Sequence, residues 1–182
     1  MATAAAPCPH GHEPRRRPTV VIRPATPSDN AAIAAIWNRE VLQTAATSDT
    51  EPRDPGAQRA WLAAHGPRHP VIVAVDGDEV VAFGALSPYR TKPAYAWTAE
   101  NSVYVKHGWR GKGRGGRVLD RLLLLAREHG HHSVIARVTA ANEASLALHE
   151  RRGFVRVGRE SQVALKHGMW LDVVTLQRIL SA

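Results

Sequence analysis

The sequence of 182 residues contains little cysteine, few aromatic side chains and no long hydrophobic run. Its one cysteine, Cys8, cannot form a disulfide bond within the chain, which is typical of a reducing compartment. Aromatic residues make up 5% of the chain, so a surface that stacks nucleic-acid bases on aromatic rings is not expected. The longest purely aliphatic run covers residues 122–126, whereas a membrane-spanning helix needs about 20 apolar residues. We therefore expect a cytoplasmic protein that binds neither nucleic acid nor a membrane.

The first 18 residues differ in composition from the rest of the chain. Residues 1–18 are rich in Pro, Ala and Arg and have no hydrophobic periodicity, so we expect a disordered basic tail. They also lack the apolar core of a secretion signal. Residues 19–182 should form one domain, because their number is sufficient to enclose a hydrophobic core.

No metal site is expected in this chain. The fragment Cys8-Pro-His10-Gly-His12 contains metal-ligand side chains, but a disordered tail does not preset the geometry that a metal needs. The three histidines within residues 129–132 lie at the end of a predicted helix and lack partner ligands, so we expect them at the solvated surface.

Hydrophobic periodicity and turn residues predict the element order β-α-α-β-β-β-α-β-α-β-β, which is typical of an α+β domain. The four predicted helices begin at Thr26, Asp54, Gly113 and Asn142. The predicted strands cover residues 19–23, 71–76, 79–86, 95–105, 133–138, 154–159 and 169–180.

The strongest chemical signal is Arg110-Gly111-Lys112-Gly113-Arg114-Gly115-Gly116, which follows a strand and precedes an amphipathic helix. Glycines let the backbone turn tightly and approach a ligand closely. A helix start presents unpaired amide groups and a dipole that favours an anion. The basic residues of the segment, together with Arg117, strengthen that preference in a chain of net charge +8. The segment is therefore expected to bind a pyrophosphate.

Two common nucleotide-binding motifs fit this segment poorly. Gly111, Gly113 and Gly116 have the spacing of the dinucleotide fingerprint, but no acidic residue follows at the end of the next strand. A P-loop requires Ser or Thr after its lysine, and Lys112 is followed by glycine. An ordinary glycine-rich loop without a ligand is the other alternative.

Arg110-x-x-Gly113-x-Gly115 before a helix resembles the coenzyme A pyrophosphate loop of the GNAT acetyltransferase superfamily, and residues 142–154 resemble its next helix and strand. The phosphinothricin N-acetyltransferase branch is more similar still, and the resemblance covers about residues 20–180. The segments that carry it are Ile22-Arg-Pro-Ala-Thr, Thr50-Glu-Pro, residues 94–105, Leu148-His-Glu-Arg-Arg-Gly-Phe154 and Lys166-His-Gly-Met-Trp170. It implies a mixed, mostly antiparallel central sheet flanked by helices, with a V-shaped coenzyme A cleft.

The resemblance also implies how acetyl-CoA binds. The pantetheine arm would pair with the backbone of one strand, and one amide of that strand would stabilise the oxyanion that forms during acetyl transfer. Asn142, by sequence a helix cap, would gain a coenzyme A contact. The implied contacts are Val103, Tyr104, Val105, Arg110, Gly111, Lys112, Gly113, Arg114, Gly115, Gly116 and Asn142.

Glu100 is the candidate general base. The attacking amine must be neutral, and an α-amino group with a pKa of about 8 is mostly protonated at pH 7. A positioned base contributes about 10²–10⁴-fold to the rate. Glu100 lies in an otherwise neutral strand just before Val103, and the resemblance places a glutamate here. The alternative is a solvent-facing glutamate or a partner in an ion pair.

His149 is the second catalytic candidate. It lies two helical turns after Asn142, so both side chains can face the same cleft. Many GNAT enzymes have a tyrosine here that is thought to protonate the coenzyme A thiolate, whereas the phosphinothricin branch has histidine. A histidine suits this role because its pKa lies near neutrality. The alternative is a histidine that only packs its helix.

The resemblance implies that residues 89–97 border the acceptor pocket. Lys92 or Arg90 would pair with a carboxylate or phosphinate. Tyr95 and Trp97 would line the slot for the acceptor side chain, although both also fit an ordinary strand core.

One segment departs from the family pattern. Before Thr50-Glu-Pro the family commonly has an aromatic residue, whereas this chain has Ala46-Thr47-Ser48-Asp49. The pocket should therefore be wider or more polar. Phosphinothricin, methionine sulfoximine, methionine sulfone and other small primary amines are all open as acceptors.

We expect an acetyl-CoA-dependent N-acetyltransferase that acetylates a small amino-acid-like molecule and works as a homodimer. Two alternatives are a protein N-terminal or lysine acetyltransferase, which needs an open acceptor groove, and a non-catalytic coenzyme A-binding module. The presence of both Glu100 and His149 favours an enzyme.

Overall fold

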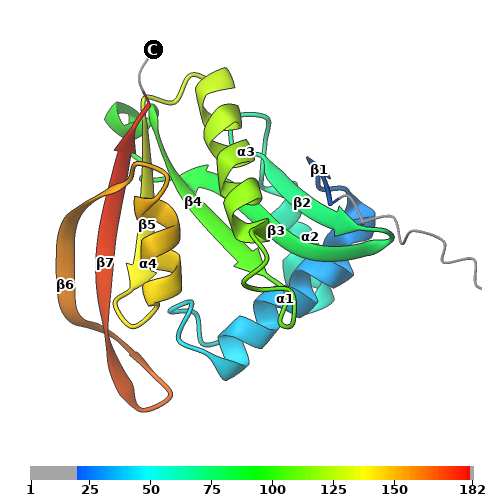
Figure 1. The fold of residues 1–182 in the computed structure, drawn as a ribbon, viewed down its shortest axis with the longest axis horizontal. Helices are drawn as coiled ribbons and strands as arrows, with labels where there is room; N and C mark the ends of the chain where they lie inside the picture. Colours follow the sequence, from blue (N-terminus) through cyan, green and yellow to red (C-terminus); the bar gives the residue numbers. More distant parts are fainter. Residues whose placement is uncertain (1–19, 181–182) are drawn as a thin grey trace, which may run out of the picture.

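Seven strands form one sheet in the order β1-β2-β3-β4-β5-β7-β6 (Figure 1). The computed structural model describes residues 20–180, so the predicted tail, with Cys8, lies outside the described residues. All neighbouring strands are antiparallel except β4 and β5, which confirms a mixed, mostly antiparallel sheet. The strands are β1 (Val21–Pro24), β2 (Val71–Asp76), β3 (Glu79–Pro88), β4 (Thr98–Val105), β5 (Ser133–Thr139), β6 (Val155–Lys166) and β7 (Met169–Ile179).

Helices cover both faces of the sheet, and each face has its own hydrophobic core (Figure 1). The helices are α1 (Asn30–Gln43), α2 (Pro55–Ala63), α3 (Arg114–Glu128) and α4 (Glu143–Glu150). On one face α1 packs through Ile33 and Trp37 against Phe83 of β3. On the other face α3 packs through Leu119 and Leu122, and α4 adds further apolar side chains. The two faces are called the α1 side and the α3 side below.

Two predicted helix starts are confirmed by side-chain caps. Asp54 Oδ1 accepts a hydrogen bond from the Ala57 amide at 2.8 Å, and Asn142 Oδ1 accepts one from the Ser145 amide at 3.2 Å. Such contacts satisfy amide groups that have no partner within the helix. The order of strands and helices is also the predicted one.

Two strands differ from the prediction. The strand expected from residue 95 begins only at Thr98, because Pro93 starts a short 3-10 helix (Pro93–Tyr95) and its ring fixes the backbone angle φ. β6 continues to Lys166 instead of ending at Arg159. Two register irregularities interrupt its pairing with β7, and an edge strand tolerates the extra residues of such bulges.

A glycine in β3 lets α3 lie close to the sheet. A Cβ atom on Gly84 would lie 2.6 Å from Cγ1 of Val118 and 2.8 Å from Cδ1 of Leu122. A side chain at Gly84 would therefore push α3 away from β3. Close packing here fixes where α3 begins, and hence where the glycine-rich segment 110–116 meets the end of β4.

The parallel pair of β4 and β5 is short. Only Thr98, Ala99 and Glu100 of β4 pair with β5, although β4 continues to Val105 and β5 continues to Thr139. Beyond Glu100 the backbones of the two strands no longer pair with each other. The sheet therefore splits between β4 and β5, and the predicted V-shaped opening lies at this split.

Candidate active site

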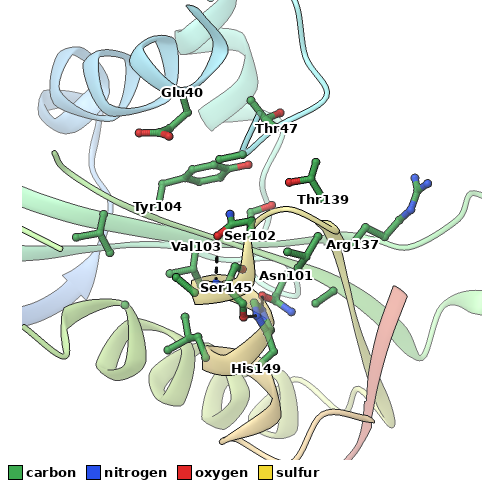
Figure 2. Close-up of a pocket in the computed structure, with 18 of the residues that line it drawn as sticks. Glu40, Thr47, Asn101, Ser102, Val103, Tyr104, Arg137, Thr139, Ser145 and His149 are labelled. Carbon is green, nitrogen blue, oxygen red and sulfur yellow. Dashed lines mark hydrogen bonds between the residues drawn. The ribbon is translucent and has the colours of Figure 1, made fainter. Parts of the chain in front are cut away.

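A cavity of about 730 Å³ occupies the split (Figure 2). Its walls come from β4, β5, the segment 110–116, α4, the second half of α1, the loop 46–49 and a few residues of β6 and β7. Figure 2 shows Glu40, Thr47 and Tyr104 on one side of the strands, and Ser145 and His149 on the other. The cavity therefore opens on both faces of the sheet.

The alternation of β4 assigns its side chains to the two faces. Ala99, Val103 and Val105 pack in the core of the α3 side, whereas Tyr104 packs in the core of the α1 side. Successive side chains of a strand point to opposite faces. Glu100 and Ser102 therefore lie on the α1 side with Tyr104.

The glycine-rich segment has the backbone shape that the sequence predicted. Gly111 and Gly113 both have a φ angle of +75°, a left-handed conformation that strongly favours glycine. Gly113 is the N-cap of α3, and Gly115 and Gly116 form its first turn. All four glycines line the cavity. The unpaired amide groups of this helix start therefore lie at the end of the opening, where an anion is favoured.

The basic side chains of this segment are mostly engaged elsewhere. Arg110 forms an ion pair with the buried Glu40, and Nη2 of Arg114 lies 2.9 Å from Oδ2 of the buried Asp76. Lys112 does not line the cavity. Their charge is therefore partly neutralised. In this structure the segment favours an anion mainly through backbone amides, whereas the sequence had suggested a larger share for arginine.

The free edge of β4 lines the cavity through Val103, Tyr104 and Val105. These three residues pair on their other edge with β3. Their edge toward β5 has no strand partner, because pairing with β5 ends at Glu100. Such an edge presents backbone groups that an extended chain can pair with, as an added strand does.

His149 is buried on the α3 side and is held by both ring nitrogens. Its Nδ1 lies 2.8 Å from the Ser145 carbonyl oxygen, and its Nε2 lies 3.1 Å from Oδ1 of Asn101. The Asn101 amide is itself oriented, since its Nδ2 donates to the Ile135 carbonyl at 3.1 Å. Burial lowers the pKa of His149. The sequence did not single out Asn101, because no periodicity or motif relates it to a residue 48 positions away.

Glu100 lines the cavity on the α1 side. Burial raises the pKa of its carboxyl group, and the positive charge of Arg137 opposes that shift. A raised pKa brings a carboxylate closer to the range in which it can exchange protons near neutrality. The two catalytic candidates therefore lie at one cavity but on opposite sides of the sheet.

The α1 side of the cavity has polar walls. The segment Ala46-Thr47-Ser48-Asp49, which departs from the family pattern, lines the cavity with Glu40 and Trp37. Thr47 Oγ1 donates to Oδ2 of Asp49 at 2.8 Å. The position expected to widen or polarise the pocket thus lies in the cavity wall.

Lys166 fixes this wall from the far end of the chain. Its side chain is buried, and Nζ donates to the carbonyl oxygens of Thr47 at 2.8 Å and Glu40 at 3.3 Å. Burial lowers the pKa of this lysine. Lys166 ends β6, so its contacts join the β6–β7 turn to the loop after α1. The sequence contains no signal for this contact, because the partners are backbone groups more than 100 residues away.

The three expected acceptor-binding residues do not line the cavity. Lys92, Tyr95 and Trp97 precede β4, and the rings of Tyr95 and Trp97 are exposed to solvent. Arg68 lies over the Trp97 ring at 5.1 Å. The structure therefore brings Glu100, His149, Asn142 and most of the coenzyme A contacts together, but it does not bring these three residues to them.

The described residues contain no cluster of three or more His, Cys, Asp or Glu side chains that would hold a metal ion. Within residues 20–180 no helix is long and apolar enough to cross a membrane. One histidine of the segment 129–132 differs from the expected solvated state. His131 is buried, and its Nε2 lies 2.8 Å from the Arg68 carbonyl oxygen, so it is part of the packing.

Comparisons with known proteins agree with this geometry. L-amino acid N-acyltransferase MnaT of Escherichia coli (strain K12) is 38% identical to this chain, over 86% of the chain and 91% of MnaT. L-methionine sulfoximine/L-methionine sulfone acetyltransferase of Salmonella typhimurium is 35% identical, over 87% of the chain and 93% of that enzyme.

A solved structure and a family model extend the match. The crystal structure of a GNAT superfamily phosphinothricin acetyltransferase from Sinorhizobium meliloti in complex with AcCoA superposes with a TM-score of 0.86 and 31% identity, covering 90% of this chain and 89% of that one. The model of the Acetyltransferase (GNAT) family matches residues 33–154. Together with the split sheet and its glycine-capped helix, these matches show that the chain belongs to the GNAT family of acetyltransferases.

Proposed function

We propose that this chain transfers the acetyl group of acetyl-CoA to the primary amine of a small amino-acid-like molecule. The observation that carries the proposal is the split between β4 and β5, with Glu100 on one face of the sheet and His149 on the other. Acetyl-CoA would enter from the α3 side, with its pyrophosphate at the first turn of α3. Its pantetheine arm would follow the free edge of β4, and the acceptor would approach from the α1 side.

In the proposed reaction the neutral amine attacks the carbonyl carbon of the thioester. The carbonyl oxygen becomes an oxyanion, and an amide of the segment Val103–Val105 stabilises it as the charge develops. The C–S bond then breaks, which gives an N-acetylated product and the coenzyme A thiolate. Glu100 takes the proton that the amine loses, directly or through water, and its raised pKa makes it a better base than an exposed glutamate.

His149 is proposed to supply a proton to the thiolate. It lies on the coenzyme A side, and its Nε2 is held 3.1 Å from Oδ1 of Asn101. Both ring nitrogens face carbonyl oxygens, so both donate only in the imidazolium form, and this form is the proton donor. Its Nε2–H group exchanges the Asn101 oxygen for the thiolate, while Nδ1–H stays on the Ser145 carbonyl. The transfer leaves the ring neutral, which is the state that burial favours.

The polar wall on the α1 side supports a small polar acceptor. Hydroxyl and carboxylate groups of the segment 46–49 lie there, where the family resemblance would place an aromatic side chain. The related enzymes are named for L-amino acids and for methionine sulfoximine and sulfone, and the solved relative is named for phosphinothricin. We infer that this chain uses an acceptor of the same class.

The experiment that tests this function measures coenzyme A release with a panel of free amino acids, methionine sulfoximine, methionine sulfone, phosphinothricin and short peptides. We expect turnover with one or more of the free amino acids or analogues. Turnover with peptides only would instead support a protein acetyltransferase. Binding of acetyl-CoA without turnover would support a non-catalytic module.

We also infer a homodimer that forms through β6 and β7. The apolar side chains of these two strands that are more than half exposed are Val155, Val157, Leu165, Met169, Trp170 and Ile179. Leu165 and Trp170 are paired across the two strands, so their side chains lie together on one face. Exposed apolar side chains that lie together in this way are typical of a contact with another protein surface. Light scattering coupled to size exclusion should give twice the monomer mass, and Trp170→Glu should reduce it to the mass of one chain. A monomeric wild type would contradict this inference.

A further inference from the structure

We propose that Arg137 binds the carboxylate of the acceptor, and so makes the enzyme selective for amino acids over simple amines. This inference rests on the proposed function, and it concerns a residue that the sequence did not single out. Arg137 lies in β5, directly after the end of the pairing with β4, and it lines the cavity.

The alternation of β5 places Arg137 on the acceptor side. Val134, Ala136 and Val138 are buried in the core of the α3 side. Arg137 lies between two of these and is exposed, so it points to the α1 side. This is the face on which Glu100 lies, and on which the amine is proposed to approach.

The register brings Arg137 close to Glu100. Glu100 is paired with Ile135, two residues before Arg137 in β5. Two residues along a strand correspond to about 7 Å, so Arg137 follows Glu100 along the wall of the opening. The positive charge of Arg137 lowers the pKa of Glu100, which burial raises. An acceptor that has an ammonium group and a carboxylate on one carbon would therefore lie beside Glu100 and Arg137, whose charges are opposite to those of the two groups.

The other arginines of the cavity are placed differently. The lining residues that the structure describes include Arg110, Arg114, Arg137 and Arg151. Arg110 and Arg114 already form ion pairs with buried carboxylates. Arg151 is the C-cap of α4 and so belongs to the α3 side. Arg137 is thus the lining arginine that faces the acceptor.

Arg137 has a partner that an acceptor can replace. Its Nη2 lies 2.6 Å from Oε2 of Glu160 in β6, and both side chains are nearly half exposed. Figure 2 shows Arg137 at the edge of the site, with its guanidinium directed away from Asn101 and His149. An exposed ion pair of this kind contributes little to stability. A guanidinium also binds a second carboxylate well, because its donors match two carboxylate oxygens.

The experiment compares an acceptor with its analogue that lacks the carboxylate. Methionine sulfone and 3-(methylsulfonyl)propylamine are a matched pair. For Arg137→Gln we expect a KM for methionine sulfone that is higher by about 10–100-fold, as for loss of a charged hydrogen-bonding partner. The KM for the propylamine and the KM for acetyl-CoA should change by less than about twofold.

Two further variants sharpen the test. Glu160→Gln should lower the KM for methionine sulfone, because it removes the competing carboxylate from Arg137. Arg159→Gln is the matched control, since Arg159 is an exposed arginine of β6 that pairs with Asp172 and does not line the cavity. It should leave the KM of both acceptors unchanged. Equal effects of Arg137→Gln on both acceptors, or no effect on either, would overturn the assignment.

A binding measurement separates this inference from the proposed function. Calorimetric titration of the two ligands into the enzyme with coenzyme A bound does not require turnover. We expect methionine sulfone to bind more tightly than the propylamine in the wild type, and the preference to be lost in Arg137→Gln. Preference without turnover would overturn the proposed function alone. Turnover without any preference would overturn the role of Arg137 alone.

Discussion

The two sides of the split sheet differ in the part of the chain that they present to a ligand. On the α3 side the ligand-facing groups are mainly backbone amides and carbonyls, from the segment 110–116 and the free edge of β4. On the α1 side they are side chains from separate segments, such as Thr47, Glu100 and Arg137. Backbone contacts depend on local conformation, whereas side-chain contacts change with each substitution. Ligand binding on the α3 side therefore depends on the conformation of the backbone. Ligand binding on the α1 side depends on which side chains are present.

The largest expected effect is on the acceptor side. Glu100→Gln keeps the shape of the side chain but removes the proposed base, so kcat should fall by about 10²–10⁴-fold. The affinity for coenzyme A should stay the same, because its contacts lie on the other side. Steady-state kinetics and calorimetry measure the two quantities. Glu128→Gln is the control, since Glu128 is an exposed residue near the end of α3. Activity within a factor of two of the wild type would exclude Glu100 as the base.

Glu100→Gln should also change how activity and stability depend on pH. Burial raises the folded-state pKa of Glu100, so this group contributes stability that is present below the ordinary glutamate pKa and is lost as pH rises through the raised value. Activity requires the ionised form, so kcat/KM should rise with pH over this range. Glu100→Gln should abolish that limb of the profile and unfold at the same or a higher temperature at neutral pH. A limb that persists in the variant would belong to another group.

The next effect tests the backbone contacts of the coenzyme side. Gly113→Val should weaken binding of coenzyme A by at least about tenfold, or ~1.4 kcal/mol. A Cβ atom at Gly113 meets no protein atom within 4 Å, so its bulk enters the cavity. Calorimetric titration with acetyl-CoA measures the change.

Gly108→Val is a matched control for backbone strain. Gly108 has a φ angle of +82°, its Cβ would also meet nothing within 4 Å, and it does not line the cavity. Both variants carry a left-handed strain of about 1–2 kcal/mol. We expect only Gly113→Val to lose affinity. Equal losses in both variants would mean that strain, rather than the cavity, controls binding.

The smallest expected effect concerns the support of the acceptor wall. Lys166→Met removes the donor that joins Thr47 and Glu40. The Glu40 carbonyl keeps its hydrogen bonds from Thr44, but the Thr47 carbonyl loses its donor, at a cost of about 1–3 kcal/mol. We expect a lower unfolding temperature and a KM for the acceptor that is higher by a few-fold, with an unchanged KM for acetyl-CoA. Lys106→Met is the control, because Lys106 is exposed and pairs with Glu79. An unchanged unfolding temperature and KM would show that Lys166 does not hold the wall.

The element order and the glycine-rich turn could be predicted from the sequence because both depend on neighbouring residues. Hydrophobic periodicity marks α3, and glycines followed by a helix mark an anion site whatever surrounds them. The start of β4 was misplaced, because the effect of Pro93 on the following residues competes with a strand-like run.

The acceptor side could not be predicted in the same way. Residues 92, 95 and 97 were expected at the pocket because the family resemblance implies it, but they precede β4 around a short 3-10 helix and do not line the cavity. Lys166 and Arg137 were not singled out, since their partners come from distant segments. Arg114, which was expected to contact coenzyme A, lines the cavity and also pairs with the buried Asp76. Such pairings depend on the register of the whole sheet.

The opening between β4 and β5 divides the sheet into two halves that pair only at one end. The strands β1 to β4 form one half and β5, β7 and β6 form the other, and only three residue pairs join them at one end. The first half contains the free strand edge that the cofactor arm is proposed to follow, while the second contains Arg137 and Lys166. Changes in β5 or β6 can therefore alter the choice of acceptor without altering the strand edge that is proposed to bind the acetyl donor.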